Sequence, residues 1–518
     1  MHLLQAQPGG IADGSEPVDL GQSPGEIVVL SAADTELANL AAARAKLPED
    51  FPSLRLANLM NLAHNLSVDL YVEAVIARAR LVVVRLLGGL GYWPYGLEQI
   101  AAACRENGTL LALLPGDDQP DAELLALSTL PKEACHRLWQ YGVHGGPVNA
   151  RNMLAYAASL IGHETDWAEP KPLLRAGIYW PGGRVTSLQD LRKDWREGAP
   201  VAAIVFYRAL VQAGNLAAVD ALIASLRDRG INPLPLYAAS LKEPVSAETL
   251  RTLMADAAPG IVLNATGFAV SSPGAERRAT PFDDADCPIL QVVFSGGTEA
   301  AWKDAANGLS ARDIAMNVAL PEVDGRILSR AVSFKSEARF DAATQCPVVT
   351  YAPVEDRVDF VAQLAANWLR LRETPAAERR LALIFANYPN RDGRLGNGVG
   401  LDTPAGALKV LRALAEAGYE VGPLPENGDA LIARLAAGPT NAATRGRRIS
   451  ETYGRADYEV FFAALPAEVR AAVTDRWGPP ERDPFFLSGA FAMPAFRLGN
   501  VVIALQPARG YNIDPQGT

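Results

Sequence analysis

The sequence lacks the motifs by which the commonest nucleotide-dependent enzymes are recognised. No glycine is followed directly by a lysine, so the G-x-x-x-x-G-K-[ST] loop that cradles the phosphates of ATP does not occur. Gly396, Gly398 and Gly400 depart from the dinucleotide fingerprint G-x-G-x-x-G, because position 401 is a leucine. These absences count against ATP hydrolysis on this chain and against a nicotinamide oxidoreductase.

Ligand sets for metals and disulfide frameworks are also missing. The chain has 4 cysteines, which are scattered and form no C-x-x-C pair, so they are expected to be reduced core residues. None of the 5 histidines belongs to an H-E-x-x-H motif, and His144 has no second ligand at helical spacing, because His136 is eight positions away. His144, which stands before two glycines, is expected to have a structural role. No metal site is predicted.

Charge and hydropathy limit the possible partners. The net charge of -10 argues against a protein that neutralises nucleic-acid phosphates, although a small anionic ligand remains compatible where arginines concentrate. No basic segment followed by an apolar core marks a signal peptide. The longest apolar runs, such as 81–87, are too short to span a bilayer, and this one contains Arg85. We expect a cytoplasmic protein without nucleic-acid or membrane partners.

Alternating strand and helix patterns predict an α/β protein with several doubly wound, mostly parallel-sheet domains and helical insertions. A chain of 518 residues is too long for one hydrophobic core. We expect a loose N-terminal segment, an N-terminal α/β domain with a helical end, a second α/β region of one or more domains, and a third α/β block that is truncated at its C-terminus. Their predicted bounds are 1–24, 25–170, 171–375 and 376–518.

Two stretches of the second region have less regular patterns. Residues 271–286 are polar, contain Arg277 and Arg278, and are typical of a mobile surface insertion. Residues 315–320, which precede a polar turn, are predicted to form a strand.

A long loop near residue 390 is the strongest candidate for a binding site. A short apolar strand is expected at 381–385 and an amphipathic helix at 402–414, with Asp402 or Thr403 as its cap. The connection at 387–400 holds glycines, two arginines and three asparagines, and it is longer than a simple turn needs. A loop of this composition before a helix N-terminus can grip an anionic ligand. An ordinary surface turn is the alternative.

The end of the sequence adds a buried strand at 501–505 and a polar loop at 509–514, and we expect that the chain is a fragment. The stretch GNVVIALQPARGYNIDP at 499–515 resembles the large subunit of aerobic ATP-dependent cobaltochelatase, a family similar to the large subunit of magnesium chelatase. Further stretches that carry this resemblance are GGLGYWPYG, YGVHGGPVNARNML, VFYRALVQAGN, NATGFA, DIAMNVALPEVDGRILSR and IFANYPNRDGRLGNGVGLDTP. The resemblance covers nearly the whole chain and favours the cobalt branch.

The resemblance implies a reaction and a division of labour. Co2+, as a substrate, is inserted into the corrin hydrogenobyrinic acid a,c-diamide during aerobic cobalamin biosynthesis. Two smaller partner subunits form an AAA+ motor that binds and hydrolyses Mg-ATP, which agrees with the missing P-loop of this chain. The chain would correspond to the N-terminal portion of the large subunit, without most of the chelation centre, so that the fragment alone would be inactive and no catalytic residue is assigned.

The resemblance also implies that the corrin is held at its periphery. Carboxylates of the corrin would be bound by arginine forks from loops that follow strands, and the candidates are Arg208, Arg391, Arg394 and Arg509. Four further residues are expected to bond the corrin amides or to orient the arginines, namely Asn387, Asn397, Tyr511 and Asp514. Two other functions remain open. One is a non-catalytic scaffold that docks the motor subunits, and the other is a magnesium-chelatase-type large subunit that acts on protoporphyrin.

Overall fold

The computed structural model describes residues 16–183, 185, 187–336, 339–387 and 392–507. The chain forms two compact units, Met1–Leu369 and Arg370–Thr518. The sequence predicted a boundary at 375/376, and the observed boundary lies inside helix α14 (Glu355–Glu373). The first unit contains two large sheets, which follow one another along the chain, and the predicted division at 170/171 falls between the last helix beside the first sheet and the first strand of the second sheet.

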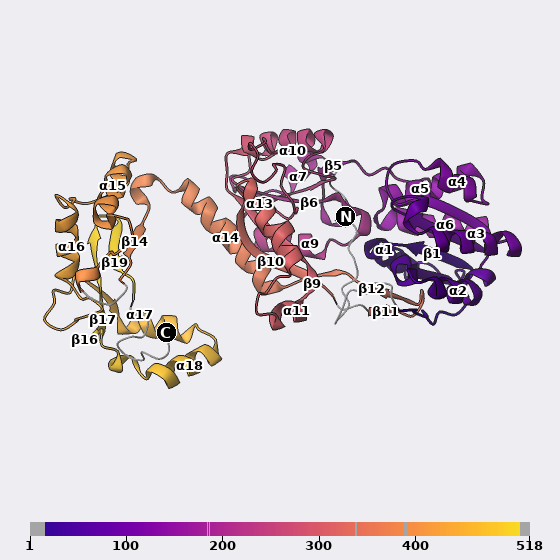
Figure 1. The fold of residues 1–518 in the computed structure, drawn as a ribbon. Coiled ribbons are helices and arrows are strands. Elements are labelled where there is room, and N and C mark those ends of the chain that lie inside the picture. The colour runs from indigo at the N-terminus through magenta and orange to yellow at the C-terminus, as the bar shows by residue number, and fades with distance from the viewer. Residues whose placement is uncertain (1–15, 184, 186, 337–338, 388–391, 508–518) are drawn as a thin grey trace. The chain divides into compact units, whose positions relative to one another are not determined.

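The first sheet is parallel throughout and has the order β2-β1-β3-β4. Its strands are β1 (Ile27–Ser31), β2 (Leu54–Asn58), β3 (Leu81–Leu86) and β4 (Leu110–Pro115). Side chains alternate between two buried faces, as they must in a sheet covered on both sides. Ile27 and Val29 belong to one core with residues of α1 (Asp34–Arg44), α5 (Lys132–His144) and α6 (Gly146–Leu160), whereas Val28 and Leu30 belong to another with residues of α2 (Asn65–Ala74) and α3 (Pro94–Asn107). Figure 1 labels these helices around the sheet.

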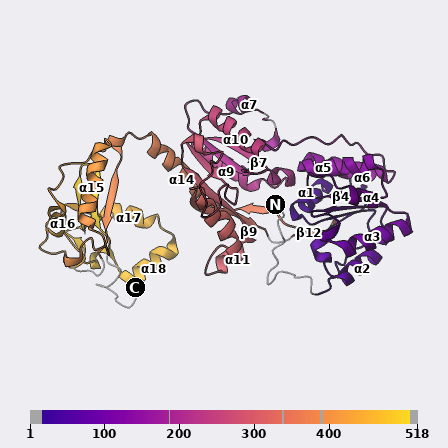
Figure 2. The same cartoon turned by 45° about the horizontal axis from the view of Figure 1, so that its top comes forward.

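The helices around this sheet begin where the sequence offers start signals, such as Pro94 in the first turn of α3. Figure 2 shows α5 and α6 on the opposite side of the sheet from α2 and α3. The helices are α1 (Asp34–Arg44), α2 (Asn65–Ala74), α3 (Pro94–Asn107), α4 (Ala122–Leu127), α5 (Lys132–His144) and α6 (Gly146–Leu160).

The second sheet has seven strands in the order β13-β10-β9-β8-β6-β7-β5, and its central strands are parallel. The edge strands β5 and β13 run antiparallel to their neighbours. The strands are β5 (Ala176–Ile178), β6 (Val201–Tyr207), β7 (Asn232–Ala238), β8 (Ile261–Asn264), β9 (Ile289–Thr298), β10 (Ile327–Lys335) and β13 (Tyr351–Pro353). A short hairpin of β11 (Arg339–Asp341) and β12 (Cys346–Val348) lies between β10 and β13 in the sequence.

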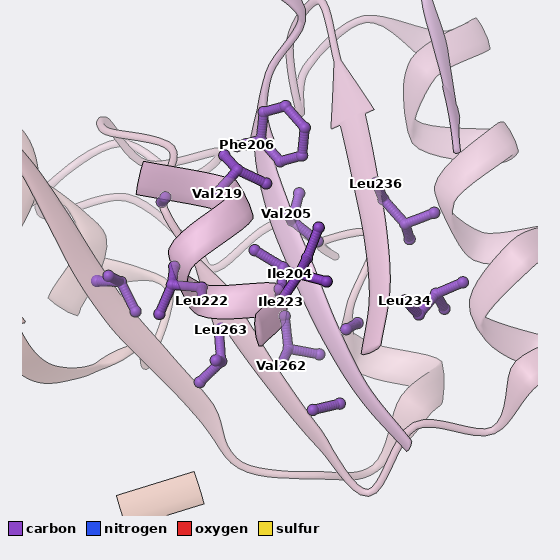
Figure 3. Packing of buried hydrophobic residues seen from close by; sticks show 14 of the residues in the cluster. Ile204, Val205, Phe206, Val219, Leu222, Ile223, Leu234, Leu236, Val262 and Leu263 are labelled. Atoms are coloured by element: carbon purple, nitrogen blue, oxygen red, sulfur yellow. The ribbon is translucent and has the colours of Figure 1, made fainter. Parts of the chain in front are cut away.

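Helices supply the rest of this core. Figure 3 shows Val219, Leu222 and Ile223 of α9 beside apolar side chains of the sheet, among them Ile204 and Leu263. The helices of this region are α7 (Leu188–Lys193), α8 (Arg208–Ala213), α9 (Ala217–Asp228), α10 (Pro244–Ala257), α11 (Glu299–Asp304), α12 (Ala311–Ile314), α13 (Leu320–Val323) and α14. These two doubly wound sheets confirm the predicted fold class.

Part of the N-terminal segment is anchored. Gln22 is buried, donates from Nε2 to the carbonyls of Leu56 and Gln345, and accepts a hydrogen bond from the hydroxyl of Tyr71. The sequence predicted a loose segment over 1–24, of which residues 1–15 lie outside the described residues. Position 22 is not loose, because the Gln22 side chain is hydrogen-bonded to two backbone carbonyls and a tyrosine hydroxyl.

The polar stretch after β8 is held by a buried ion pair. Asp324 accepts hydrogen bonds from the backbone N–H groups of Val270 and Ser271 at 2.7 and 3.0 Å. Arg326 donates from Nη2 to Asp324 at 2.8 Å and from Nη1 to the carbonyl of Thr266 at 3.2 Å, and both charged side chains are almost inaccessible to solvent. Burial lowers the pKa of Arg326. The start of the stretch predicted to be mobile is therefore tied to the protein interior.

The predicted strand at 315–320 is wrong. Residues Ala315–Ala319 form one turn of π-helix between α12 and α13, and the backbone carbonyl of Met316 accepts from the N–H of Phe268 at 2.8 Å. A short run with several apolar residues fits a strand or a helix equally well by periodicity. The helical form is stabilised by Asp313, which accepts from Ser295, Gly296 and Asn317.

The second unit is built on a small three-stranded sheet in the order β14-β19-β18, with a separate antiparallel sheet in the order β15-β17-β16. Its strands are β14 (Leu381–Phe385), β15 (Glu451–Gly454), β16 (Phe486–Leu487), β17 (Ala490–Met493), β18 (Ala495–Leu498) and β19 (Val501–Leu505). Its helices are α15 (Thr403–Glu416), α16 (Gly428–Ala436), α17 (Arg455–Ala463) and α18 (Ala467–Trp477). Leu411 and Leu431 of α15 and α16 are fully buried against the three-stranded sheet.

No helix within the described parts of the chain combines the length and the apolar character needed to cross a membrane.

The Asp324–Arg326 pair generates a stability prediction. Replacing Asp324 by alanine leaves Arg326 buried without its counter-charge, so we expect the free energy of unfolding to fall by about 3–5 kcal/mol. Hydrogen exchange at the amides of Val270 and Ser271 should also accelerate. Urea unfolding and exchange measured by mass spectrometry test both effects, with the exposed Glu322→Ala as the matched control. Equal stability of the two variants would contradict this role for the ion pair.

The 271–286 stretch generates a pH prediction. The Arg277 guanidinium donates two hydrogen bonds to Asp283 and lowers the pKa of that carboxyl to about 2. Because the folded-state pKa lies below the ordinary value of 3.8, the contact stabilises the fold above pH 3.8 and is lost as the pH falls through about 2. Carboxyl chemical shifts from an NMR titration should give the low pKa in the native chain. In the Arg277→Gln variant the pKa of Asp283 should rise towards its ordinary value. In the control Arg278→Gln it should stay low.

Candidate functional site

The candidate binding loop lies at the carboxyl end of two parallel strands. Strand β14 pairs with β19 from Leu381 opposite Val501 to Phe385 opposite Leu505, and the N–H of Gln506 extends the ladder to the carbonyl of Phe385 at 2.8 Å. The loop leaves β14 after Phe385 and leads into α15, whose first turn is capped by the Asp402 carboxylate on the N–H of Ala405 at 3.1 Å. Ligands of α/β sheets commonly bind at this edge.

A glycine fixes the base of the loop. The backbone N–H of Gly396 donates to the carbonyl of Ala386 at 2.8 Å, which closes the loop on the end of β14. Gly396 has a φ of +67°, and a Cβ atom at this position would lie 2.8 Å from Cδ1 of Phe385. Only glycine adopts this backbone conformation without strain and leaves room for the phenylalanine ring.

A carboxylate clamp joins the loop to the segment after α16. Asp392 accepts a hydrogen bond from the Thr440 hydroxyl at 2.6 Å and forms an ion pair with Nη2 of Arg447 at 2.5 Å. Arg447 also donates to the carbonyl of Ala436. Sequence reasoning missed this segment. Its signal was the polar stretch 439–448, with glycine, threonine, asparagine and three arginines directly after a helix.

Two asparagines lie buried at the same edge. The side-chain amide of Asn441 donates to the carbonyl of Gln506 at 2.9 Å and so fastens the segment after α16 to the end of β19. Asn387, two residues beyond β14, is only 4% exposed. Neither its Oδ1 nor its Nδ2 has a hydrogen-bond partner among the described residues. A buried amide without partners is costly, so Asn387 is the most unusual polar group of this edge.

Other predicted site residues of the loop are exposed. The side chains of Arg394 and Asn397 face solvent, and the carbonyl of Arg394 accepts from the N–H of Asn397 at 3.2 Å. Val399 at the loop tip is fully exposed and Leu401 is 74% exposed. The structure thus brings Asn387, Arg394 and Asn397 together on one loop. The remaining predicted residues of this unit lie outside the described residues, namely Arg391, Arg509, Tyr511 and Asp514.

Arg208 belongs to the first unit and has backbone partners. Its Nε donates to the carbonyl of Leu174 at 2.8 Å, and its Nη2 donates to the carbonyls of Leu173 and Val143 at 2.9 and 3.4 Å. Burial lowers the pKa of this guanidinium. Arg208 therefore holds the 173–174 segment in place through Nε and Nη2, which leaves Nη1 as the nitrogen best able to meet a ligand.

His144 shares this neighbourhood. Its Nδ1 accepts a hydrogen bond from the backbone N–H of Leu173 at 3.4 Å, and its pKa is lowered by burial and by the positive charge of Arg208. A neutral imidazole that accepts from the backbone agrees with the structural role expected for it. Within the described residues, no group of three or more His, Cys, Asp or Glu side chains could hold a metal ion.

Comparison with known proteins identifies the family. The family described as CobN/Magnesium Chelatase matches residues 139–518. The chain is 52% identical over 524 residues to the aerobic cobaltochelatase subunit CobN of Sinorhizobium sp, in an alignment that covers 100% of this chain and 41% of that protein. It is 26% identical over 447 residues to the H subunit of magnesium chelatase from Rhodobacter capsulatus, in an alignment that covers 77% of this chain and 36% of that protein.

A solved structure gives the same relationship. The catalytic subunit of cobaltochelatase from Mycobacterium tuberculosis superposes with a TM-score of 0.72 at 31% sequence identity, over 94% of this chain and 39% of that chain. The chain thus spans about two fifths of the length of these relatives, 41% of the Sinorhizobium protein. The resemblance predicted from the sequence is confirmed, and the chain belongs to the CobN/magnesium chelatase family.

Proposed function

We propose that this chain is the N-terminal, substrate-binding portion of a cobaltochelatase large subunit. In this proposal the complete enzyme inserts Co2+ into hydrogenobyrinic acid a,c-diamide during aerobic cobalamin biosynthesis, and separate AAA+ subunits hydrolyse ATP. Identity of 52% to a cobaltochelatase protein, against 26% to a magnesium-chelatase protein, supports the cobalt branch. The absence of a P-loop from the sequence supports a motor on other chains.

One observation carries the proposal. The loop within IFANYPNRDGRLGNGVGLDTP, one of the stretches that carry the resemblance, lies at the carboxyl edge of β14 and β19, where it contains a buried asparagine without partners among the described residues and an exposed arginine. An arginine fork binds a carboxylate by two parallel hydrogen bonds. An edge that combines such a cation with an unpaired amide suits a ligand that has both carboxylate and amide groups, as a corrin does.

Within this proposal the residues have separate tasks. The arginines Arg391, Arg394 and Arg509 of the second unit would bind peripheral carboxylates. Arg208 belongs to the first unit and remains a separate candidate, which would bind a carboxylate through Nη1. The groups that would bond amides or orient the arginines are Asn387, Asn397, Tyr511 and Asp514. The residues of the second unit would hold and orient the macrocycle.

Cobalt insertion also requires a base that takes protons from the ring nitrogens and ligands that replace the water around the ion. The described residues contain no cluster suited to holding a metal. We therefore assign the chelation step to the remainder of a complete large subunit and to this chain the binding of the corrin. The fragment alone should bind its substrate without inserting cobalt.

Two alternative functions predict different ligands for this chain. A scaffold that only docks the motor subunits needs no corrin affinity, and its supporting feature is α17, whose Val460 and Phe461 are 76% and 56% exposed. A magnesium-chelatase-type large subunit would prefer protoporphyrin. Its support is the weaker similarity to the Rhodobacter magnesium-chelatase protein.

The corrin-binding proposal is tested by titrating the intact chain with metal-free corrin and recording the visible spectrum. We expect a spectral change at micromolar concentrations and no comparable change with protoporphyrin. Arg394→Ala removes one charge-assisted contact and should raise the Kd about tenfold, a loss of about 1.4 kcal/mol. The exposed Arg412→Ala on α15 is the matched control and should leave the Kd unchanged.

The outcomes separate the alternatives. If the visible spectrum of micromolar corrin does not change when the wild-type chain is present, while the motor subunits still bind the chain, the scaffold function replaces the proposed one. If protoporphyrin binds more tightly than corrin, the magnesium-chelatase function replaces it. If Arg394→Ala binds corrin as tightly as the control, Arg394 is not a carboxylate fork.

A further inference from the structure

The starting observation is the buried side chain of Asn387. The residue is 4% exposed, yet Oδ1 and Nδ2 both lack a hydrogen-bond partner among the described residues. Most buried polar side-chain atoms in proteins have at least one partner. Leaving a buried amide unpaired costs about 1–3 kcal/mol, and a ligand that pairs with both atoms would remove this cost.

The polar groups described at the same edge of the sheet are paired with one another. At the end of β14 and β19, the side-chain amide of Asn441 donates to the carbonyl of Gln506, and the backbone N–H of Gln506 donates to the carbonyl of Phe385. The carboxylate of Asp392 forms an ion pair with Arg447 and accepts a hydrogen bond from the hydroxyl of the fully buried Thr440. Arg447, the cation of this network, is paired with Asp392.

We propose that Asn387 is a specificity-determining residue that recognises a primary carboxamide on the ligand. The inference rests on the proposed function and deepens it, because it assigns an uncharged side arm of the macrocycle to this edge, whereas the arginines take its carboxylates. Oδ1 of Asn387 accepts a hydrogen bond from the N–H of the ligand amide, and Nδ2 donates to the ligand carbonyl.

The chemistry of the pair explains the selectivity. A primary carboxamide offers one donor edge and one acceptor edge, which matches the two unpaired atoms of Asn387. A carboxylate in the same position offers only acceptors, so that it leaves Oδ1 facing another oxygen. Burying a carboxylate also costs more than burying a neutral amide unless a cation pairs with it. Sites built to hydrogen-bond a substrate group discriminate against analogues that lack it.

The experiment compares two metal-free corrins that differ only at the a and c side arms, as carboxamides or as free carboxylates. Visible titration of the wild-type chain should give a preference of about 10- to 100-fold for the diamide, from one buried hydrogen-bonded pair. Asn387→Asp replaces the donor by an acceptor and should abolish this preference. The exposed Asn107→Asp is the matched control and should retain it.

A second variant separates recognition from a structural role. Asn387→Leu keeps the number and branching of the side-chain heavy atoms and removes both unpaired polar atoms, so the midpoint of urea unfolding of the ligand-free chain should stay the same or rise. The same variant should lose the preference for the diamide. A lowered unfolding midpoint without ligand would assign Asn387 a structural role and overturn the inference.

The remaining outcomes distinguish the inference from the function. If the wild-type chain binds both corrins equally and Asn387→Asp changes neither affinity, the carboxamide assignment fails while corrin binding stands. If the wild-type chain binds neither corrin, the proposed function fails, and the inference that rests on it fails too.

Discussion

The parallel pairing of β14 with β19 is the constraint on which the candidate site depends. The two strands come from opposite ends of the second unit, and their register places Phe385 opposite Leu505. This pairing brings the loop after β14 and the end of β19 to one edge, where Asn441 joins the segment after α16 to Gln506. Without it, the segment after α16 would lose its contact with the end of β19. The apolar residues that hold the sheet against α15 and α16 are therefore also the support of the polar edge.

Much of the architecture could be predicted because it follows from local patterns. Strands such as β3 and β14 are short apolar runs, and helices such as α3 and α15 have proline in the first turn and apolar residues at helical spacing. Alternation of these elements is enough to predict parallel sheets. The π-helical turn at Ala315–Ala319 could not be predicted, because its conformation depends on Asp313 and on a backbone contact with Phe268.

The contacts around the candidate loop could be predicted only in part, for the same physical reason. The composition of the loop marked it as a candidate, and its place after a strand follows from the sequence. The clamp by Thr440 and Arg447 depends on contacts between residues far apart in the chain, which no local pattern encodes. The partners of Arg208 are likewise backbone carbonyls of a distant segment. An arginine after a strand therefore predicts a cation at a sheet edge, but the sequence does not show which groups of the protein the arginine already binds.

The loop at Gly396 has a consequence for how this region can change during evolution. Its base admits no side chain, because the ring of Phe385 fills the space where a Cβ would stand. Its tip, by contrast, ends in a fully solvent-exposed Val399. We therefore expect a side chain to be selected against at Gly396, whereas insertions and deletions should be tolerated at the exposed tip. Homologues should accordingly keep the glycine and vary in loop length on the tip side.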